Sequence, residues 1–426
     1  MWKRKSWGIV IAMVFLVCAG AFANGTNEGS KQKITLNVLS QPRREWEYLE
    51  KFLNEFKAKE GIDVKISYFA ENERRSKSRL DASTKAGQFQ VYYIDEANVA
   101  EFALNNWLVP IKSYYPAEYD FDDFSKPLVN VLTIKGVAYG APISFEGSMI
   151  FYRKDLFEKD GIAVPKTLDE YMAAVKHFQN PPDLYGTGTR GLRGSGMNVW
   201  RFSPYLIRFG GRWLDDAGNP VFNSPEAVKA VQYYIELIKN SPGATMSWSD
   251  VMDNFAAGKE AIVEFANLKA DYILDPKDSK VIDKVGFAAP AGSLSNIAVH
   301  GLAISAAGCP SEDLRKAAGK FIGWWTSKEN SIRRVKSGNG LTNGRVSTFA
   351  SPEFAAAYPP AYAKAQLEMM KDQQMCILQI PQWPEIGDYL GVKLEELFTK
   401  AYSGQPYDIQ AALDDAVNYT KNVLKK

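Results

Sequence analysis

Histidine and cysteine are scarce in this chain, which limits the chemistry that it can carry out. Among 426 residues there are two histidines, His177 and His300, and three cysteines. Neither a G-x-S-x-G nor an H-E-x-x-H motif occurs, so nothing supports a nucleophilic hydrolase or a zinc protease. Cys309 and Cys376 lack the spacing of a metal site; they could pair in an oxidising compartment, but two separate buried thiols are the better expectation. We expect no catalytic residue, no metal and no cofactor.

Strong net charge and long apolar runs are also missing. The formal net charge is +2 at pH 7, which gives no electrostatic reason to expect a nucleic-acid partner. After the first 23 residues, no apolar run approaches the about 20 residues that a membrane-spanning helix requires. Single hydrophobic cores rarely grow beyond ~250–300 residues, so the length of the chain predicts at least two domains.

The N-terminus has the three parts of a secretory signal peptide. Lys3–Lys5 is basic, Trp7–Val17 is apolar, and Ala21–Ala23 supplies the small residues of a cleavage site. Residues 1–23 are therefore predicted to be a signal peptide that is removed. Cys18 leaves a second interpretation open, in which this cysteine carries a lipid anchor. Residues 24–33 are rich in Gly, Asn, Ser and Lys and are predicted to form a flexible tether.

The first unit after this tether alternates strands and helices. Apolar runs predict three strands, at Ile34–Leu39, Val64–Phe69 and Phe89–Ile94, with helical spacing between them. This β-α-β-α-β order implies parallel strands, and such sheets bind ligands at the carboxyl ends of their strands. Three polar segments occupy those ends: Gln41–Arg44, Ala70–Arg75 and Asp95–Asn98.

The stretch from Tyr139 to Phe157 combines a small-residue entry with an apolar extended run in which Glu146 is the one acid. We interpret it as a strand that crosses between two α/β lobes and carries a carboxylate at the crossing. An ordinary strand with a solvent-facing Glu146 is the alternative. A second unit follows, with helix-start signals at Thr167 and Ser224.

A glycine-rich segment and several aromatic residues are candidates for ligand contact. Gly186–Gly191 matches G-x-G-x-x-G, but prolines precede it and more glycines follow, so it predicts a flexible loop near a ligand rather than a dinucleotide site. Arg190, Asn198 and Trp200 could reach that ligand. Three tryptophans stand close to polar residues: Trp200, Trp248 and Trp383. Such rings can stack on the C–H face of a sugar while polar groups bind its hydroxyls; core packing is the alternative for several of them.

Several short segments follow one another along the chain in an informative order: 87–95, 106–110, 139–157, 164–170, 209–213, 255–261, 301–304, 324–327 and 380–382. In this order and behind a signal peptide, they resemble the extracellular solute-binding proteins of bacterial ABC importers, in the class that binds maltose, oligosaccharides and polyols. Segments 188–200 and 210–215 are most similar to the polyol-binding branch. The resemblance covers essentially the whole chain after the signal peptide.

The resemblance implies an α/β fold of two lobes, the type II arrangement of periplasmic binding proteins, with a ligand cleft between the lobes. It assigns residues 34–143 and 304–345 to an N-terminal lobe. Residues 144–303 and 346–426 then form a C-terminal lobe. Three hinge crossings are expected near 142–146, 302–306 and 343–349.

The resemblance also implies roles for single residues. Glu146 falls where relatives carry a ligand-contacting acid beside the hinge, and Trp200 falls where an aromatic ring stacks on the sugar. Trp383 is close to another stacking position. Two departures from the family pattern, His300 and Glu264, leave the identity of the ligand open. Together with the candidates from the sequence pattern, the predicted ligand-binding residues are Arg44, Asp95, Glu96, Asn98, Glu146, Arg190, Asn198, Trp200, Trp248, Glu264, His300 and Trp383.

The implied function is the capture of a sugar, oligosaccharide or polyol outside the cytoplasm and its delivery to a membrane permease. No Walker A motif occurs, so the ATPase of such an importer must be a separate chain. We expect an exported monomer, periplasmic or extracellular. Two alternatives remain open: a secreted carbohydrate-active enzyme with paired carboxylates, and a binding protein for an acidic or phosphate-bearing solute. Four arginines in the strand-end segments could neutralise the charge of such a solute: Arg43, Arg44, Arg74 and Arg75.

Overall fold

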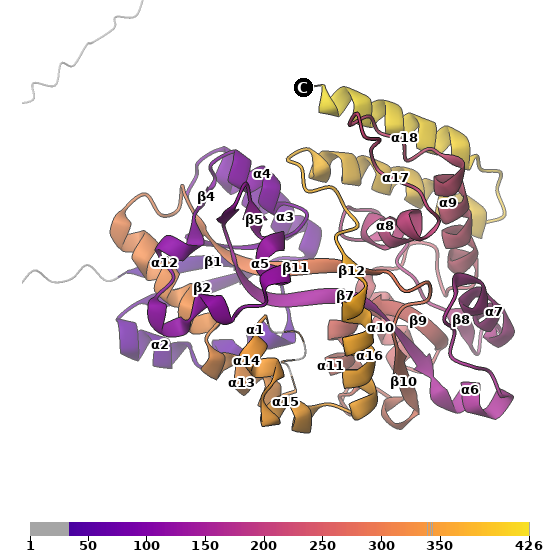
Figure 1. Cartoon of the computed structure of the whole chain (residues 1–426), viewed down its shortest axis with the longest axis horizontal. Coiled ribbons are helices and arrows are strands. Elements are labelled where there is room, and N and C mark those ends of the chain that lie inside the picture. The colour runs from indigo at the N-terminus through magenta and orange to yellow at the C-terminus, as the bar shows by residue number, and fades with distance from the viewer. Residues whose placement is uncertain (1–33, 339, 341, 343, 426) are drawn as a thin grey trace, which may run out of the picture. The chain divides into compact units, whose positions relative to one another are not determined.

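Figure 1 shows the protein as a computed structural model, which describes residues 34–338, 340, 342 and 344–425. The predicted signal peptide, the tether and Cys18 fall on residues 1–33 and so lie outside the described residues.

Three parallel strands begin the described part of the chain. β1 (Thr35–Ser40) pairs along its whole length with β2 (Asp63–Tyr68) and at two residues with β3 (Val91–Asp95). The predicted parallel pairing is therefore confirmed, and the carboxyl ends of the three strands point to the same edge of the sheet. Two helices follow β1 and one follows β2: α1 (Arg44–Glu50), α2 (Leu53–Glu60) and α3 (Glu71–Ser83).

Two long antiparallel strands connect these strands to a second set. β11 (Ser295–Ser305) pairs with β3 on one side and with β7 (Ala141–Arg153) on the other. The second half of β7 pairs with β9 (Glu260–Ala266) and β10 (Val285–Ala288), which gives the strand order β2-β1-β3-β11-β7-β9-β8. The strand predicted within 139–157 is thus confirmed. Its Glu146 is buried, so the alternative of a solvent-facing carboxylate was wrong. The remaining strands are short: β4 (Leu108–Val109), β5 (Thr133–Ile134), β6 (Val137–Ala138), β8 (Tyr185–Thr187) and β12 (Gln373–Gln374).

We call β1, β2 and β3 with the helices packed around them the first lobe. Its aromatic core joins distant parts of the chain, because Trp46 of α1 lies 4.2 Å from Trp325, measured between ring centroids. Phe56 of α2 contacts Phe321 edge to face. The chain therefore returns to the first lobe after β11. Besides α1–α3, its helices are α4 (Val99–Leu104), α5 (Lys126–Val131), α12 (Glu312–Trp325) and α13 (Lys328–Lys336).

We call β8, β9 and β10 with their helices the second lobe. The capping box predicted at Thr167 is present, since its hydroxyl accepts from the backbone of Glu170 and the Glu170 carboxylate accepts in return. Two C-terminal helices pack on α8 and α9, at the right of Figure 1. The helices are α6 (Lys154–Asp160), α7 (Leu168–Phe178), α8 (Asn198–Arg208), α9 (Pro225–Lys239), α10 (Trp248–Ala256), α11 (Ala270–Ile273), α17 (Trp383–Tyr402) and α18 (Ile409–Leu424).

The segment between α13 and α17 contacts both lobes. α14 (Val346–Phe349) and α15 (Pro352–Ala357) contact α13, whereas α16 (Pro360–Lys371) lies against β7 and β10. Residues 339, 341 and 343 lie outside the described residues. The residue boundaries predicted for the lobes, and the third crossing near 343–349, stay predictions.

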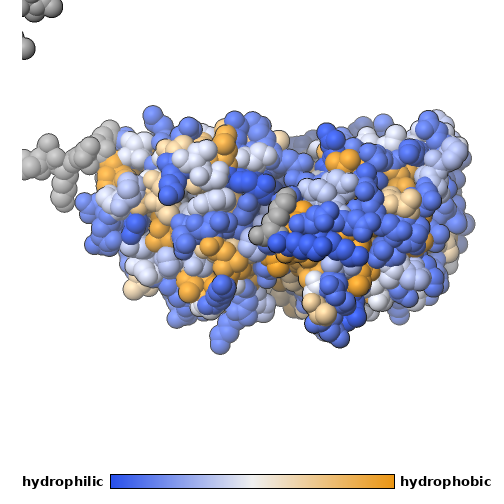
Figure 2. Space-filling model, turned by 90° about the horizontal axis from the view of Figure 1, so that it is seen from above, coloured by the Kyte–Doolittle hydropathy of each residue, from blue (hydrophilic) through white to orange (hydrophobic). Residues whose placement is uncertain are grey.

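The face shown in Figure 2 is mainly hydrophilic, with apolar side chains in small separate patches. Within the described ranges, no helix combines the length and the apolar character needed to cross a bilayer. Cys309 and Cys376 are buried and unpaired, as expected for two separate thiols.

Candidate ligand-binding site

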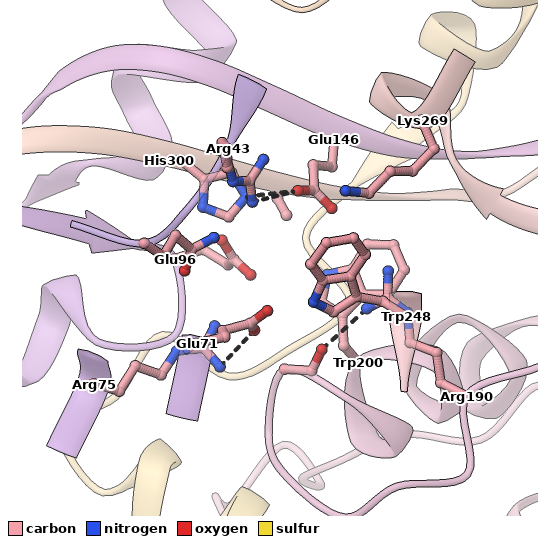
Figure 3. Close-up of a pocket in the computed structure, with 13 residues that line it drawn as sticks. Arg43, Glu71, Arg75, Glu96, Glu146, Arg190, Trp200, Trp248, Lys269 and His300 are labelled. Carbon is pink, nitrogen blue, oxygen red and sulfur yellow. Dashed lines mark hydrogen bonds and ion pairs between the residues drawn. The ribbon is translucent and has the colours of Figure 1, made fainter. Parts of the chain in front are cut away.

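A cavity opens where the carboxyl ends of β1, β2 and β3 face the second lobe (Figure 3). It encloses about 440 Å³ of empty space, part of which is open to solvent. The lining residues are Gln41, Arg43, Glu71, Arg75, Glu96, Glu146, Arg190, Gly196, Trp200, Trp248, Lys269, Ala298 and His300. All three strand-end segments predicted from the sequence contribute to this lining, as the geometry of parallel sheets requires.

Glu146 lies at the centre of a buried polar cluster on β7. Its Oε1 accepts a hydrogen bond from Arg43 Nη2 at 2.9 Å and lies 2.8 Å from His300 Nε2. Burial alone would raise the pKa of Glu146, but the charge of Arg43 and the hydrogen bond with His300 outweigh it and hold the pKa well below its usual range. Burial and the nearby Arg43 lower the pKa of His300, which favours the neutral imidazole. Glu146 is therefore an anion with a fixed orientation.

His300 reaches this cluster because the pairing of β11 with β7 shifts register between His300 and Gly301. Such an irregularity re-aims a side chain locally. Arg43 reaches the cluster from the loop after β1, and its Nη1 has no hydrogen-bond partner among the described residues. The cluster thus ties both long strands to the first lobe and still presents a free donor.

A second ion-paired group stands on the first turn of α3. Glu71 Oε1 lies 2.8 Å from Arg75 Nη1, and Arg75 also contacts Asp95 Oδ2 at 2.8 Å. Asp95 is fully buried and additionally bonded to Arg74. Burial would raise the pKa of Asp95, but the charges of Arg75 and Arg74 lower it strongly. Asp95 therefore positions Arg75 from behind, and Glu71 and Arg75 face the cavity.

Glu96, at the end of β3, contributes a carboxyl group of a different kind. Its Oε2 accepts from the backbone N–H of Val299 at 3.2 Å. Burial, reinforced by the neighbouring Asp95, raises the pKa of Glu96 well above its usual range. The shift favours the protonated carboxyl group of Glu96, whose free oxygen can donate a hydrogen bond.

The glycine-rich segment supplies one wall of the cavity. The Arg190 guanidinium lies 4.7 Å from the centroid of the Trp200 ring and 4.5 Å from that of Phe265, and Nη1 donates to Gly196 O at 3.0 Å. Its Nε has no hydrogen-bond partner among the described residues. A side chain at Gly196 would collide with the Glu71–Arg75 pair, because a Cβ there would stand 2.1 Å from Glu71 Oε1. The two lobes can approach this closely only at a glycine.

Lys269 and Trp248 form the wall beyond Glu146 (Figure 3). The Lys269 ammonium nitrogen lies 3.6 Å from the centroid of the Trp248 ring. Burial, together with the positive charge of Arg43, lowers the pKa of Lys269 to about 7. No hydrogen bond or ion pair of this ammonium occurs among the described residues. The Lys269 nitrogen can therefore donate a hydrogen bond to a ligand hydroxyl.

The structure brings six of the predicted residues to the cavity: Glu96, Glu146, Arg190, Trp200, Trp248 and His300. The other six lie elsewhere. Asp95 is behind the lining, and Asn98 caps the end of β3, where its Oδ1 accepts from the Asp95 backbone N–H at 3.0 Å. Asn198 Nδ2 donates to the carbonyl of Gly391 at 2.8 Å and so ties α8 to α17.

Three further candidates have partners away from the cavity. Glu264 is buried between two cations, accepting from Arg201 Nη1 at 2.9 Å and from Arg208 Nη2 at 2.8 Å. Trp383 is fully buried and packs edge to face on Trp213 in the second lobe. Arg44 pairs with two aspartates of the second lobe, at residues 275 and 278, outside this cavity.

Sequence reasoning did not select several lining residues as ligand contacts. Glu71 and Gln41 stand in the strand-end segments that were identified, and Arg43 and Arg75 were considered only for an acidic solute. Lys269 carried no signal, although it follows the end of β9 directly. In the part of the chain that is described, no cluster of three or more His, Cys, Asp or Glu residues could hold a metal ion.

Comparison with known proteins places this arrangement in a family. The family described as bacterial extracellular solute-binding protein matches residues 44–332. The mannitol-binding protein of Pseudomonas aeruginosa is 29% identical over 377 residues, which span 82% of this chain and 84% of that protein. An ABC transporter solute-binding protein from Agrobacterium vitis S4, solved with bound D-mannitol, matches with a TM-score of 0.82 at 30% identity over 92% of this chain and 98% of that chain.

A solute-binding protein from Agrobacterium radiobacter K84, solved in complex with ribitol, matches with a TM-score of 0.83 at 27% identity, again over 92% of this chain and 98% of that chain. The two-lobed type II fold expected from the sequence is confirmed by these structures. The chain belongs to the bacterial extracellular solute-binding protein family.

Proposed function

We propose that this protein captures a polyol or a monosaccharide between its lobes and delivers it to the permease of an ABC importer, without turnover of the ligand. The observation that carries the proposal is the mixed lining of the cavity, in which cations, carboxyl groups and two tryptophan rings occur together. A hydroxyl group donates and accepts at once, so a polyhydroxylated ligand can satisfy both kinds of neighbour. The rings suit its C–H face.

The compact lining of the cavity favours a small ligand, because side chains from both lobes converge on it. The relatives named above bind mannitol or ribitol, which are single linear polyols. A hexitol or pentitol is therefore the ligand class that we propose first.

Closure of the lobes is the proposed mechanism of capture. The first lobe contributes Arg43, Glu71 and Glu96 to the cavity, and the second contributes Arg190 and Lys269. A ligand that contacts both sets stabilises the closed form relative to the open one. A micromolar site corresponds to about −8 kcal/mol, which a few charge-assisted hydrogen bonds and one stacked ring can provide after the cost of closure.

The cellular setting follows from the same proposal. The protein would act as an exported monomer in the periplasm, or at the cell surface if Cys18 carries a lipid. Its partners would be the permease subunits of the importer, with ATP hydrolysis on a separate chain.

An acidic sugar is a second candidate ligand, favoured by one observation. Four cationic side chains but only three carboxyl groups line the cavity, and burial raises the pKa of one of these, Glu96, well above its usual range. The excess of positive charge would accommodate one carboxylate of a polyhydroxy acid.

A thermal-shift panel tests both candidates. The purified protein is melted alone and with D-mannitol, D-sorbitol, ribitol, D-glucose, D-gluconate and D-glucuronate. A ligand at 100 times its Kd should add about 2.7 kcal/mol to the free energy of unfolding. Stabilisation by neutral polyols supports the first candidate, and stabilisation by the acids alone supports the second. No shift with any of these compounds would contradict the proposed function.

A further inference from the structure

A second cavity adjoins the first on the side of α1, α10 and α11. It encloses about 980 Å³, part of it open to solvent. Arg43, Trp248 and Lys269 line both cavities. These side chains therefore form a partition between the two spaces.

Within this partition, Arg43 is held differently from the other two residues. Arg43 is fixed by its hydrogen bond to Glu146. Trp248 is the first residue of α10, and its backbone is positioned by a capping box in which Ser247 and Asp250 bond reciprocally. Lys269 ends the short turn after β9, and its ammonium rests on the Trp248 ring at 3.6 Å. The ring and the ammonium together fill the gap next to the Arg43 cluster.

The second cavity has the groups that a sugar ring needs. Tyr272 provides an aromatic face, and Met252 and Leu268 provide apolar surface. Asp253 and Asp271 contribute carboxyl groups, and Asp271 Oδ1 is buried with no hydrogen-bond partner among the described residues. Directional oxygen acceptors beside an aromatic ring match a carbohydrate better than a purely apolar ligand.

We propose that Trp248 and Lys269 set the upper size limit of the ligand by separating the second cavity from the first. The native protein then takes a single polyol or monosaccharide. Removal of the Trp248 ring joins the cavities, and the enlarged site accepts a polyol that carries one further sugar ring. This inference rests on the proposed function.

The test compares D-sorbitol with maltitol, which is a glucosyl-sorbitol, and D-mannitol with pure glucosyl-mannitol, by titration calorimetry. The native protein should bind the preferred hexitol at least about 100-fold more tightly than its glucosyl derivative. In Trp248→Ala the hexitol should bind about tenfold more weakly, since a stacked ring is lost. The glucosyl-hexitol should bind more tightly than it does to the native protein. The ratio of the affinity for the hexitol to the affinity for the glucosyl-hexitol should therefore fall by more than tenfold.

Two further variants complete the experiment. Lys269→Ala keeps the ring and should lower the ratio in the same direction by a smaller factor, which also covers the case that Trp248→Ala fails to fold. Glu73→Ala, at an exposed position on α3 that lines neither cavity, should leave the ratio unchanged. Equal weakening of both ligands in Trp248→Ala and Lys269→Ala, or native protein that binds both ligand classes equally, overturns the inference. If the native protein binds no polyol or sugar at all, the proposed function has failed instead.

Discussion

Glu146 is a buried carboxylate that joins structural partners and also lines the candidate site. Its Oε1 is occupied by Arg43 and His300, and the resulting pKa, well below the usual range, keeps the group charged. The side chain nevertheless lines the cavity. A buried anion held in this way is preorganised, so a ligand hydroxyl can bond to it without first reorienting the side chain.

The substitution Glu146→Gln keeps the shape of the side chain but removes its charge. Because a hydrogen bond to a charged group contributes about 1.5–3 kcal/mol, ligand affinity should fall roughly 10- to 100-fold. Calorimetry with the polyol that stabilises the native protein measures this loss. Glu73→Gln, at an exposed position on α3, serves as the control and should bind normally. Unchanged affinity in Glu146→Gln would show that the ligand does not use this carboxylate.

At the scale of elements, the start of α1 contacts the segment that follows α11. Arg44 Nη1 donates to Asp275 Oδ2 at 2.7 Å, and Nη2 contacts Asp278. The guanidinium also lies 4.9 Å from the centroid of the Tyr272 ring. We call the contacts of Arg44 with this segment the clasp. Neighbouring Arg43 faces the cavity and Lys269 directly precedes α11, so the clasp joins the lobes beside the cavity in Figure 3 without lining it.

The clasp should govern ligand release more than ligand entry. Partly exposed ion pairs contribute about 0.2–1 kcal/mol each, and the Arg44 side chain is 32% exposed. Arg44→Ala should therefore raise koff by about two- to tenfold and change kon little. Stopped-flow fluorescence at low and high salt measures both rates, and the native protein should approach the variant at high salt. Lys57→Ala removes an ion pair within the first lobe and is the control. A change in kon alone, with koff unchanged, would contradict the predicted role of the clasp in ligand release.

At the scale of the whole molecule, stability depends on buried charges outside the binding site. Glu264 lies between Arg201 and Arg208, each with a side chain at most 2% exposed. Burial alone would raise the pKa of Glu264, but the two cations lower it to about 2. An anion that is this well compensated in the folded state contributes stability as long as it remains charged.

This pKa predicts acid sensitivity of a definite sign. Since the folded pKa of Glu264 is lower than the unfolded value of about 4.5, its contribution is complete above pH 4.5 and is lost as pH falls toward 2. Over that window the native protein should lose on the order of 3 kcal/mol from this group. Urea unfolding of the native protein and of Glu264→Gln, at pH 7 and pH 3, isolates the contribution. The variant should be less stable at pH 7 and should lose less stability on acidification. If the free energy of unfolding changed with pH equally in both proteins, the predicted contribution of Glu264 would be contradicted.

Local sequence pattern predicted much of this fold. The alternation of apolar runs and helical spacing is set by side chains along one segment, so β1, β2, β3 and β7 appeared at nearly their observed positions. Parallel order then determined which segments meet at the cavity, and Arg43, Glu71 and Glu96 line it.

Which polar side chain faces the cavity was decided only by the tertiary structure. Glu146 and Glu264 are both acids within apolar strands, and both were predicted to contact the ligand, Glu146 from its place in the family pattern and Glu264 as a departure from that pattern. Packing places two buried arginines beside Glu264, whereas Glu146 meets a single arginine and a register-shifted histidine at the edge of the cavity. The two predicted tryptophans differ in the same way: Trp383 packs in the core, whereas Trp248 lies between the two cavities. Sequence fixes the period and the chemistry of each element, but the partners of a side chain come from segments far away in the chain and exist only once the lobes are packed.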